Sequence, residues 1–489
     1  MRSVRTLLAL CGLSVMAGCQ DSRISRDASP PGLEVPPVLL SDAEGGAILE
    51  AGEISFDPSR ELLSFAEAAV NQSPRVRAAG FALQGASARV REQQGAFYPQ
   101  VSVDFERNQV DQAILFSSQP SFSGNTSEFP TETFGLRVSQ TVYDAEASAG
   151  IDVAMDEREA ARARTDSAFQ DELDTVLTLY LDGIEALERY QAADAAVRYL
   201  STVNRIERLE VEAGRLRASA RADTVADLAQ AETDREIAVA DFQTRSEAFC
   251  RLAQVEICPA IQSLALDGVL PAIAPLTEEE RERVRQNPDI RAIEQALQAA
   301  TSEIDQARGA FYPRVTLDFA REGVNRGGSL FDGASQTLTD TLTLNIGWDI
   351  YNGGTRIAAT ARQIAEASEL RHLQEADIRD LLRALETASD AIETLYENDQ
   401  RLSRVLGARA VALRLANDEV EAGLANPVAA AQARYAYVLA QVGRATVRRN
   451  YLLAVVARAR ATGSLDFDMV QTIGALAVDD RAARRALDL

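Results

Sequence analysis

The sequence predicts a mainly helical protein with a transmembrane β part, built from a duplicated helix–strand–strand–helix unit. Three observations predict this fold class: an internal repeat, long intervals without proline, and four segments in which apolar and polar residues alternate. A long repeat of this kind indicates a duplicated structural unit. The chain is therefore expected to contain two copies of one design, preceded by an export segment and followed by a C-terminal tail.

Residues 1–18 have the composition of an export signal. Arg2 and Arg5 give a positive start, and an apolar stretch too short to span a bilayer follows. The segment that ends at Cys19 resembles a bacterial lipoprotein signal, in which the cysteine is lipidated, carries palmitate and becomes the N-terminus. Ordinary cleavage near Gly18, with an unmodified Cys19, is the alternative.

The stretch after the signal, residues 19–55, contains two proline pairs and one glycine pair with little periodicity. Such a composition is typical of an extended linker. With Cys19 lipidated, this stretch would be a lipid-anchored extended tether.

The repeat is clearest where GAFYPQVSVDF, which starts at Gly95, returns as GAFYPRVTLDF at Gly309, an offset of 214 residues (309 − 95). Farther along, Glu212 and Glu421 each begin a Glu-Ala-Gly sequence. The first structural repeat is expected over 56–258 and the second over 259–463, which leaves 464–489 as the C-terminal tail.

Two long intervals without proline, 131–258 and 314–426, permit very long helices. A helix from about 145 to 214 would be ~100 Å long at ~1.5 Å per residue. Each interval carries apolar residues at steps of four and three, which predicts coiled-coil packing. These seam positions are Leu173, Leu177, Tyr180, Ile184 and Leu187 in the first copy, and Leu381, Leu385, Ala388, Ile392 and Leu395 in the second.

Each copy inserts two alternating segments between its helices. Strands are expected at about 100–107 and 133–143 in the first copy, and at about 314–321 and 341–351 in the second. Their lengths suit tilted strands that cross a bilayer, with apolar side chains outward and polar ones inward. The segments between paired strands, about 108–131 and 322–339, are polar and are expected to be long loops.

Aromatic residues gather at the ends of the expected strands and fit an interfacial girdle. They are Phe97, Tyr98 and Tyr143 in the first copy, and Phe311, Tyr312, Trp348 and Tyr351 in the second. A soluble sandwich with half-buried strands is the alternative. Four strands cannot close a membrane barrel, whose minimum is about eight. The transmembrane interpretation therefore requires association, and three chains would supply twelve strands.

The composition excludes several functions. The formal net charge of −23 argues against a nucleic-acid partner, because phosphates require a basic face. The chain has no lysine, and its single histidine, His372, lies in a helical pattern and is expected at the surface. No catalytic motif is present, so an enzyme is not expected, nor is a cofactor or a metal site.

Two cysteines remain after the signal and its lipidation site. Cys250 and Cys258 follow a helix and precede Pro259. In a protein bound for an oxidising compartment they could form a disulfide, or they could remain free thiols.

Together the repeat, the strand pairs and the signal resemble the outer membrane efflux protein family, the TolC-type channels, in their lipoprotein subtype. The resemblance covers about residues 60–463. It rests on the AFYP sequences at Ala96 and Ala310, the Tyr-Asp and Tyr-Asn sequences at Tyr143 and Tyr351, and the Glu-Ala-Gly turns at Glu212 and Glu421.

This resemblance implies a homotrimer with a twelve-strand β-barrel in the cell outer membrane, in contact with its lipid, that continues into a twelve-helix periplasmic α-barrel. Such a protein is a passive exit duct for small molecules. It works in a tripartite efflux system with a periplasmic adaptor (a membrane fusion protein) and an inner-membrane pump of the RND or ABC type.

The same resemblance places the two Glu-Ala-Gly turns at the periplasmic tip, where the adaptor binds. The tip residues are Gly214, Arg215, Gly423, Leu424 and Pro427. The acidic residues Asp418, Glu419 and Glu421 are gate candidates, because three copies of each would form a cation-attracting ring. A solvated helix face is the alternative interpretation of these acidic residues.

Two other functions compete with small-molecule efflux. The same fold could serve type I protein secretion, and nothing in the chain separates these two roles decisively. A non-conducting structural coiled-coil lipoprotein would explain the heptads and the tether, but not the paired strands with aromatic ends.

Overall fold

The computed structural model describes residues 58–113, 115, 126–253, 261–264, 266, 270–329 and 333–477. All of them belong to one compact unit, Asp57–Leu489. The predicted signal peptide, Cys19, the tether and Cys258 lie outside the described residues.

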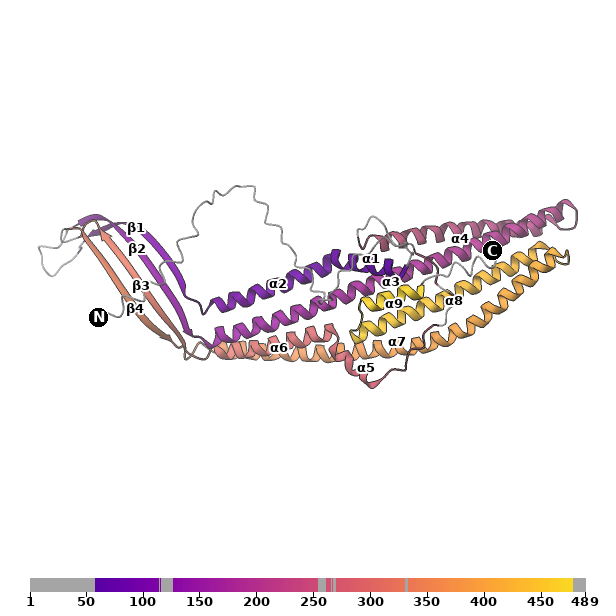
Figure 1. The fold of residues 1–489 in the computed structure, drawn as a ribbon. Helices are drawn as coiled ribbons and strands as arrows, with labels where there is room; N and C mark the ends of the chain where they lie inside the picture. Colours follow the sequence, from indigo (N-terminus) through magenta and orange to yellow (C-terminus); the bar gives the residue numbers. More distant parts are fainter. Residues whose placement is uncertain are drawn as a thin grey trace, which may run out of the picture. The chain divides into compact units, whose positions relative to one another are not determined.

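The same order of elements occurs twice along the chain (Figure 1). The first set is α1 (Pro58–Gln72), α2 (Pro74–Gly95), β1 (Gln100–Ala113), β2 (Thr126–Tyr143), α3 (Ala145–Glu212) and α4 (Ala218–Cys250). The second set is α5 (Glu278–Arg283) with the 3-10 turn η2 (Val284–Gln286), α6 (Pro288–Gly309), β3 (Arg314–Arg326), β4 (Ser335–Gly347), α7 (Thr355–Glu421) and α8 (Pro427–Thr462). A further helix, α9 (Phe467–Ala477), lies in the expected C-terminal tail.

The helix that leads into each hairpin begins with a capping residue followed by proline. Ser73 caps α2 and Asn287 caps α6, each through a side-chain oxygen that accepts a backbone N–H. Proline suits the next position, because a backbone N–H in the first turn of a helix has no intrahelical acceptor and proline lacks this group. The two capping residues also hydrogen-bond to longer helices. Ser73 Oγ donates to Glu172 on α3 at 2.7 Å, and Asn287 Nδ2 donates to the carbonyl of Arg460 on α8 at 2.7 Å.

The four strands form one antiparallel sheet in the order β1-β2-β3-β4. All four expected strand boundaries on the side away from the helices were wrong, because β1 continues to Ala113, β2 starts at Thr126, β3 continues to Arg326 and β4 starts at Ser335. About half of the segments expected as loops, 108–131 and 322–339, is therefore paired strand. The physical reason is that backbone hydrogen bonds between strands also form where the side chains on both faces are polar. The alternation of apolar and polar residues cannot detect such strand segments.

β4 differs from the expectation at both ends. It starts earlier, at Ser335, and stops at Gly347, so the expected strand end at 351 was wrong. Gly347 pairs with Arg314, which is the first residue of β3. Beyond that pair β3 offers β4 no further backbone partner, and the ladder ends.

The long helices agree with the sequence prediction. α3 has 68 residues and α7 has 67, so each is ~100 Å long at ~1.5 Å per residue. The predicted seam is confirmed, because Leu173, Leu177 and Ile184 on α3, and Leu385 on α7, are fully buried.

The main hydrophobic core forms where α1, α3, α8 and α9 meet. It also includes Phe249 at the end of α4, whose ring centroid lies 4.3 Å from that of Phe65 on α1. The tail helix α9 contributes Val470 and Ile473 to this core. The C-terminal helix therefore stabilises the middle of the helical region.

Four helices next to the sheet lie in a row that matches the strand order: α2 contacts α3, α3 contacts α6, and α6 contacts α7 (Figure 1). Next to the sheet, the two repeats thus meet through β2 with β3 and through α3 with α6, and farther from the sheet α3 also packs against α8. Within the described residues, no helix combines the length and the apolar character needed to cross a bilayer.

Candidate functional site: the sheet faces and the tip turns

The sheet presents one apolar and one polar face. Residues directly opposite each other in an antiparallel pair point to the same side, so the register assigns the faces. Val101 pairs with Val138, Val138 with Phe319, and Phe319 with Leu342, and this row lies on the apolar face. Most large apolar side chains of this face are exposed, including Val101, Val103, Phe105, Phe134, Leu338, Leu342, Leu344 and Ile346.

The length of the apolar band matches a membrane. Along β4 the band runs from Leu338 to Ile346, which corresponds to about 27 Å at ~3.4 Å per residue. The apolar band of outer-membrane barrels is ~25 Å tall. An exposed apolar face of this extent is expected to contact lipid rather than water.

One charged pair interrupts the apolar face. Arg321 on β3 and Asp340 on β4 are direct partners, and the guanidinium donates to both carboxylate oxygens at 2.6 and 2.7 Å. A bidentate pair satisfies both groups, which lowers the cost of placing them beside apolar neighbours. Alternation in the sequence did not reveal this pair, because the expected strands ended at 321 and began at 341.

The polar face is acidic. It carries four carboxylates, Asp104, Glu106, Asp318 and Glu322, against three arginines, Arg137, Arg314 and Arg326, and threonines follow along β4. If this face lined a pore, its charge would favour cations over anions. In the sequence these residues are only the polar half of the alternation, because their common side depends on the register across all four strands.

The seven predicted girdle aromatics lie at one end of the sheet, the end next to the helices. Phe97, Tyr98, Phe311 and Tyr312 precede β1 and β3, whereas Tyr143 ends β2, and Trp348 and Tyr351 follow β4. The indole N–H of Trp348 donates to the carbonyl of Phe311 at 3.0 Å. A tryptophan or tyrosine with one apolar and one polar side suits a membrane–water interface.

The two predicted tip turns have the same backbone geometry. Gly214 and Gly423 have φ values of 69° and 71°, in the left-handed region that favours glycine. After Gly214, two backbone N–H groups donate to the carbonyl of Glu210 at 2.8 and 3.2 Å. After Gly423, two donate to the carbonyl of Glu419, also at 2.8 and 3.2 Å.

The return helices begin differently. Asn426 caps α8 by accepting the N–H of Val428 at 3.0 Å, and Pro427 follows as the first helical residue. The corresponding residue before α4 is Arg217, which makes no side-chain capping bond. The predicted tip residue Leu424 is 81% exposed, so this turn presents an apolar side chain to the surroundings.

The gate candidates Asp418, Glu419 and Glu421 are all exposed on the last turn of α7. Leu413, one to two turns before them on α7, is buried, whereas the three gate candidates are open to the surroundings of the single chain. Their side chains are free to face either a central passage or a neighbouring molecule.

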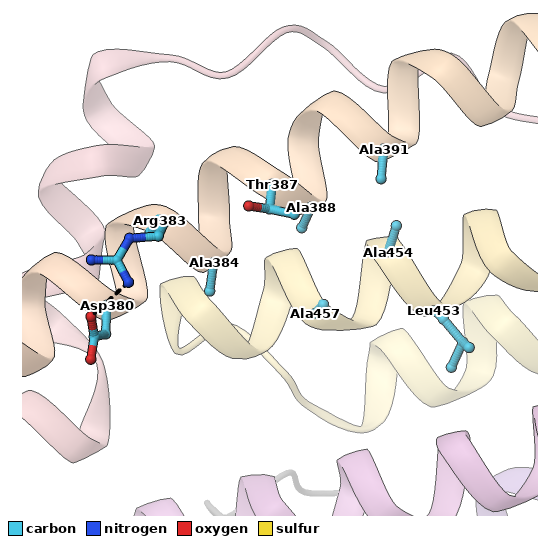
Figure 2. A pocket seen from close by; sticks show the side chains of 9 residues that line it. All are labelled: Asp380, Arg383, Ala384, Thr387, Ala388, Ala391, Leu453, Ala454 and Ala457. Carbon is cyan, nitrogen blue, oxygen red and sulfur yellow. Dashed lines mark ion pairs between the residues drawn. The ribbon is translucent and has the colours of Figure 1, made fainter.

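Two hollows lie between the helices. The first, of about 570 Å³, is lined mainly by alanines of α7 and α8 (Figure 2). Figure 2 shows Asp380 and Arg383 as an ion pair at one end of this hollow, 3.1 Å apart. Small side chains here allow the two helices to approach closely, and the lining supplies few polar groups for a ligand.

The second hollow, of about 610 Å³, lies between α3, α7 and α8. At its edge the rings of Tyr199 on α3 and Tyr435 on α8 stack with centroids 5.5 Å apart. This stack joins the hairpin of α3 and α4 to the hairpin of α7 and α8, close to the tip turns. The position of this stack depends on how the hairpins pack, so no local pattern in the sequence predicts it.

A buried ion cluster lies between α7 and α8. Asp399 accepts hydrogen bonds from Nε of Arg444 at 2.8 Å and from Nε of Arg448 at 2.9 Å, and all three side chains are buried. Burial raises the pKa of Asp399, but the hydrogen bonds from Arg444 and Arg448 outweigh this effect and hold the pKa below the ordinary aspartate value. Asp399 lies four residues after Leu395 and therefore occupies a seam position that is otherwise apolar. A charged residue at such a position is a signal in the sequence that could have identified this cluster.

The remaining predictions concern His372, the cysteine pair and metal binding. His372 is exposed on α7, as expected. Cys250 is disulfide-bonded, and its predicted partner Cys258 lies outside the described residues. The described part of the chain contains no cluster of side chains suited to hold a metal ion.

Comparison with known proteins adds two findings on the sequence. Residues 282–464 match the family model described as outer membrane efflux protein. Outer membrane protein OprJ of Pseudomonas aeruginosa is 31% identical over 160 residues, which is 32% of this chain and 32% of OprJ. OpmQ of Pseudomonas putida, named as a pyoverdine export outer membrane protein, is 27% identical over 184 residues, which is 37% of this chain and 38% of OpmQ. The matched region thus spans about a third of the length of these curated relatives.

A solved structure shares the fold. The crystal structure of CusC, described as forming a transmembrane channel, superposes with a TM-score of 0.69 at 17% identity and covers 85% of this chain and 95% of CusC. The predicted fold class is thereby confirmed in its coarse form, a helix-rich chain of the TolC type. Both sequence relatives are named outer membrane proteins, which confirms the predicted location in the outer membrane.

Proposed function

We propose that this chain, whose residues 282–464 match the family model of outer membrane efflux proteins, is the outer-membrane exit duct of a tripartite efflux system. It passively conducts small molecules from a periplasmic adaptor and an inner-membrane pump, of RND or ABC type, to the exterior.

The observation that carries this proposal is the sheet with one exposed apolar face and one acidic face. No helix covers the apolar face within the described residues, and the long helices all lie beyond one end of the sheet (Figure 1). In a closed barrel the apolar face contacts lipid and the acidic face lines water. A soluble sandwich would have to cover the apolar face with a second layer.

Closure requires more than one copy, because both β1 and β4 are edges of the sheet. Three copies give a barrel of twelve strands, within the known range for such barrels. The helices of the three copies continue the barrel as a twelve-helix tube in the periplasm. Lipidation of Cys19 anchors the N-terminus to the same membrane and belongs to this proposal.

The tip turns are the proposed contact with the adaptor. Leu424 offers an exposed apolar side chain, and Arg215 lies at the matching position of the other turn. Asp418, Glu419 and Glu421 form the proposed gate, in which a threefold acidic ring attracts cations and narrows the passage.

The experiment is single-channel conductance of the purified protein in a planar bilayer, with the oligomeric mass measured in the same detergent. We expect a trimer with a small, cation-preferring conductance. A trimer or monomer that never conducts would contradict the duct and favour the non-conducting structural lipoprotein.

The gate has its own test. Replacing Asp418 and Glu419 by Asn and Gln is expected to raise conductance and to weaken the preference for cations. The matched control replaces Glu210 and Glu212 of the first tip turn by Gln, which removes the same charge at the other tip. If both variants conduct equally, the gate assignment is wrong, although the duct stands.

A further inference from the structure

The second hollow, between α3, α7 and α8, differs from the first in its walls and in its charge. Its volume of about 610 Å³ falls within the range of small-molecule sites, ~300–1,000 Å³. The first hollow is lined mainly by alanines, whereas the second combines tyrosines, aliphatic side chains and a few charged and amide groups. Neither the passage nor the tip contact proposed above requires this hollow.

We infer that the second hollow is a binding site for a small aromatic carboxylate, held between the hairpin of α3 and α4 and the hairpin of α7 and α8. The inference goes beyond the proposed duct, because it concerns the space between the helices of one chain and does not depend on conduction.

The walls of the hollow come from both hairpins and from the connector between the repeats. α3 contributes residues within 190–202, α7 contributes Leu406, and α8 contributes residues within 427–441. The connector supplies Leu264 and Leu266. A ligand in the hollow would therefore touch four segments that are far apart in the sequence.

The connector is held in place on both sides of the hollow. Gln191 of α3 donates to Oγ of Ser263 at 2.7 Å, and Arg444 of α8 donates to the carbonyl of Leu266 at 2.6 Å. Leu264, between these two attachment points, is buried. This wall is therefore already formed in the chain without a ligand, which lowers the cost of ordering it on binding.

Tyrosine rings form much of the remaining wall. Tyr199 of α3 and Tyr435 of α8 stack with an angle of 2° between their planes, and Tyr190 and Tyr437 also line the hollow. Tyr437 is buried, and its hydroxyl accepts a hydrogen bond from Gln441 at 3.3 Å. Such rings offer face and edge contacts to an aromatic ligand.

The charge of the lining favours an anion. It contains Arg198, Arg434 and Asp194, a formal charge of +1 (2 − 1), in a chain whose formal net charge is −23. Asp194 pairs with Arg198 at 2.7 Å. Arg434 is exposed and has no ion pair among the residues that the structure describes. Its guanidinium is free to bind a carboxylate through two parallel N–H groups.

The first turn of α8 adds to this preference. Pro427 and Ala430, at the start of this 36-residue helix, both line the hollow. The N-terminal end of a helix carries a partial positive charge, which stabilises a nearby anion. One unpaired guanidinium matches a monoanion, and the tyrosines match a ring. Together these features indicate an aromatic carboxylate rather than a metal ion or a cation.

Direct binding tests the site. The probe is 2-naphthoate, an aromatic carboxylate, and the matched neutral ligand is 2-naphthamide, which has the same rings without the charge. Isothermal titration of the full-length protein in nonionic detergent, with micelles alone as the blank, is expected to show one saturable site per chain for 2-naphthoate. The amide is expected to bind about tenfold more weakly, because it cannot form the charge-assisted hydrogen bonds.

Three variants separate charge from ring contact. Arg434→Gln is expected to weaken 2-naphthoate about tenfold and to abolish the preference for the acid over the amide. The matched control Arg409→Gln removes an exposed arginine of α7 outside the hollow and is expected to leave both affinities unchanged. Tyr199→Leu removes a ring rather than a charge, so it is expected to weaken both ligands alike.

Hydrogen exchange locates the ligand independently of these variants. Because the ligand touches α3 and α8 together, 2-naphthoate is expected to slow exchange in both 195–202 and 430–438. Slower exchange elsewhere, with neither of these segments affected, would overturn the assignment to this hollow.

The titration can also overturn the inference. Equal affinities for acid and amide, or uptake that does not saturate, would mean partition into detergent. Equal losses in Arg434→Gln and Arg409→Gln would assign the effect to the overall charge of the chain. Failure of the wild type to bind would exclude the small-molecule site and leave the hollow to a side chain of a partner protein.

Conductance of the same wild-type preparation keeps this inference separate from the proposed function. A chain that binds 2-naphthoate but never conducts would contradict only the duct. A chain that conducts but does not bind 2-naphthoate would contradict only the site.

Discussion

The two repeats of this chain share their local structure but differ in their neighbours. α6 is buried between α3 and α7, whereas its counterpart α2 contacts α3 and is open on its other side (Figure 1). Gly309 is tightly enclosed, and Gly95, at the same place in the repeat, is not. Equivalent residues of the two repeats can therefore contribute differently to stability, because the contribution of a residue depends on what packs against it.

A second difference lies in the seam of the long helices. Gln191 on α3 follows Leu187 by four residues, as Asp399 follows Leu395 on α7. Gln191 donates a neutral hydrogen bond to Ser263 at 2.7 Å, whereas Asp399 holds two buried arginines. The second repeat therefore depends on charge pairing at a point where the first repeat does not.

The largest expected effect is the removal of this charge. Asp399→Asn leaves Arg444 and Arg448 buried without their carboxylate, which is expected to cost about 3–5 kcal/mol of folding free energy. Gln191→Leu, the matched change in the first repeat, removes one neutral hydrogen bond and is expected to cost about 1 kcal/mol. Denaturant unfolding followed by circular dichroism measures both, and equal losses would show that the two repeats are stabilised alike.

The same cluster predicts a dependence on pH. Because the pKa of Asp399 is lowered in the folded protein, its stabilising effect is present above the ordinary aspartate pKa of 3.8 and is lost as the pH falls through the lowered value. Thermal unfolding of the wild type should therefore shift to lower temperature below pH 3.8. Asp399→Asn should lack this part of the shift, and an identical acid profile for both proteins would contradict the assignment.

The glycines are expected to show an effect of intermediate size and opposite sign in the two repeats. Gly309→Ala forces a methyl group against the start of α3 and should destabilise by about 1–3 kcal/mol. Gly95→Ala meets open space and should stabilise an isolated chain by roughly 0.5–1 kcal/mol, because alanine is the better helix former. Unfolding of the dissociated chain in mild denaturant measures the sign. A loss of stability in both variants would mean that Gly95 is already enclosed.

The smallest expected effects concern the two tip turns. Asn426→Ala removes the cap of α8 and should cost about 1 kcal/mol, whereas Arg217→Asn supplies α4 with the cap that it lacks and should stabilise by a similar or smaller amount. Hydrogen exchange of the first-turn amides in α4 and α8 reports each change locally. Unchanged protection of α4 in Arg217→Asn would show that the first turn cannot adopt the capped geometry.

The features that follow from local periodicity could be predicted from the sequence. The duplication, the two long helices, the seam at Leu173 and Leu385, and the glycine turns at Gly214 and Gly423 were all readable because helix spacing and left-handed glycines depend on neighbours within a few residues. The gathering of the seven aromatic residues near the strand ends was readable for the same reason, and their role as an interfacial girdle stays a prediction.

The tertiary structure alone decided what depends on distant partners. The strands extend into polar segments because backbone pairing requires a partner strand and not apolar side chains. The alternation in the sequence therefore gave strands that were too short on the side away from the helices. It also placed the end of β4 four residues beyond Gly347. Arg321 meets Asp340, and Asp399 meets Arg444 and Arg448, only after the sheet register and the helix packing are set. The open edges at β1 and β4 are likewise a property of the assembled sheet, because no single segment of the sequence determines which of its neighbours is missing.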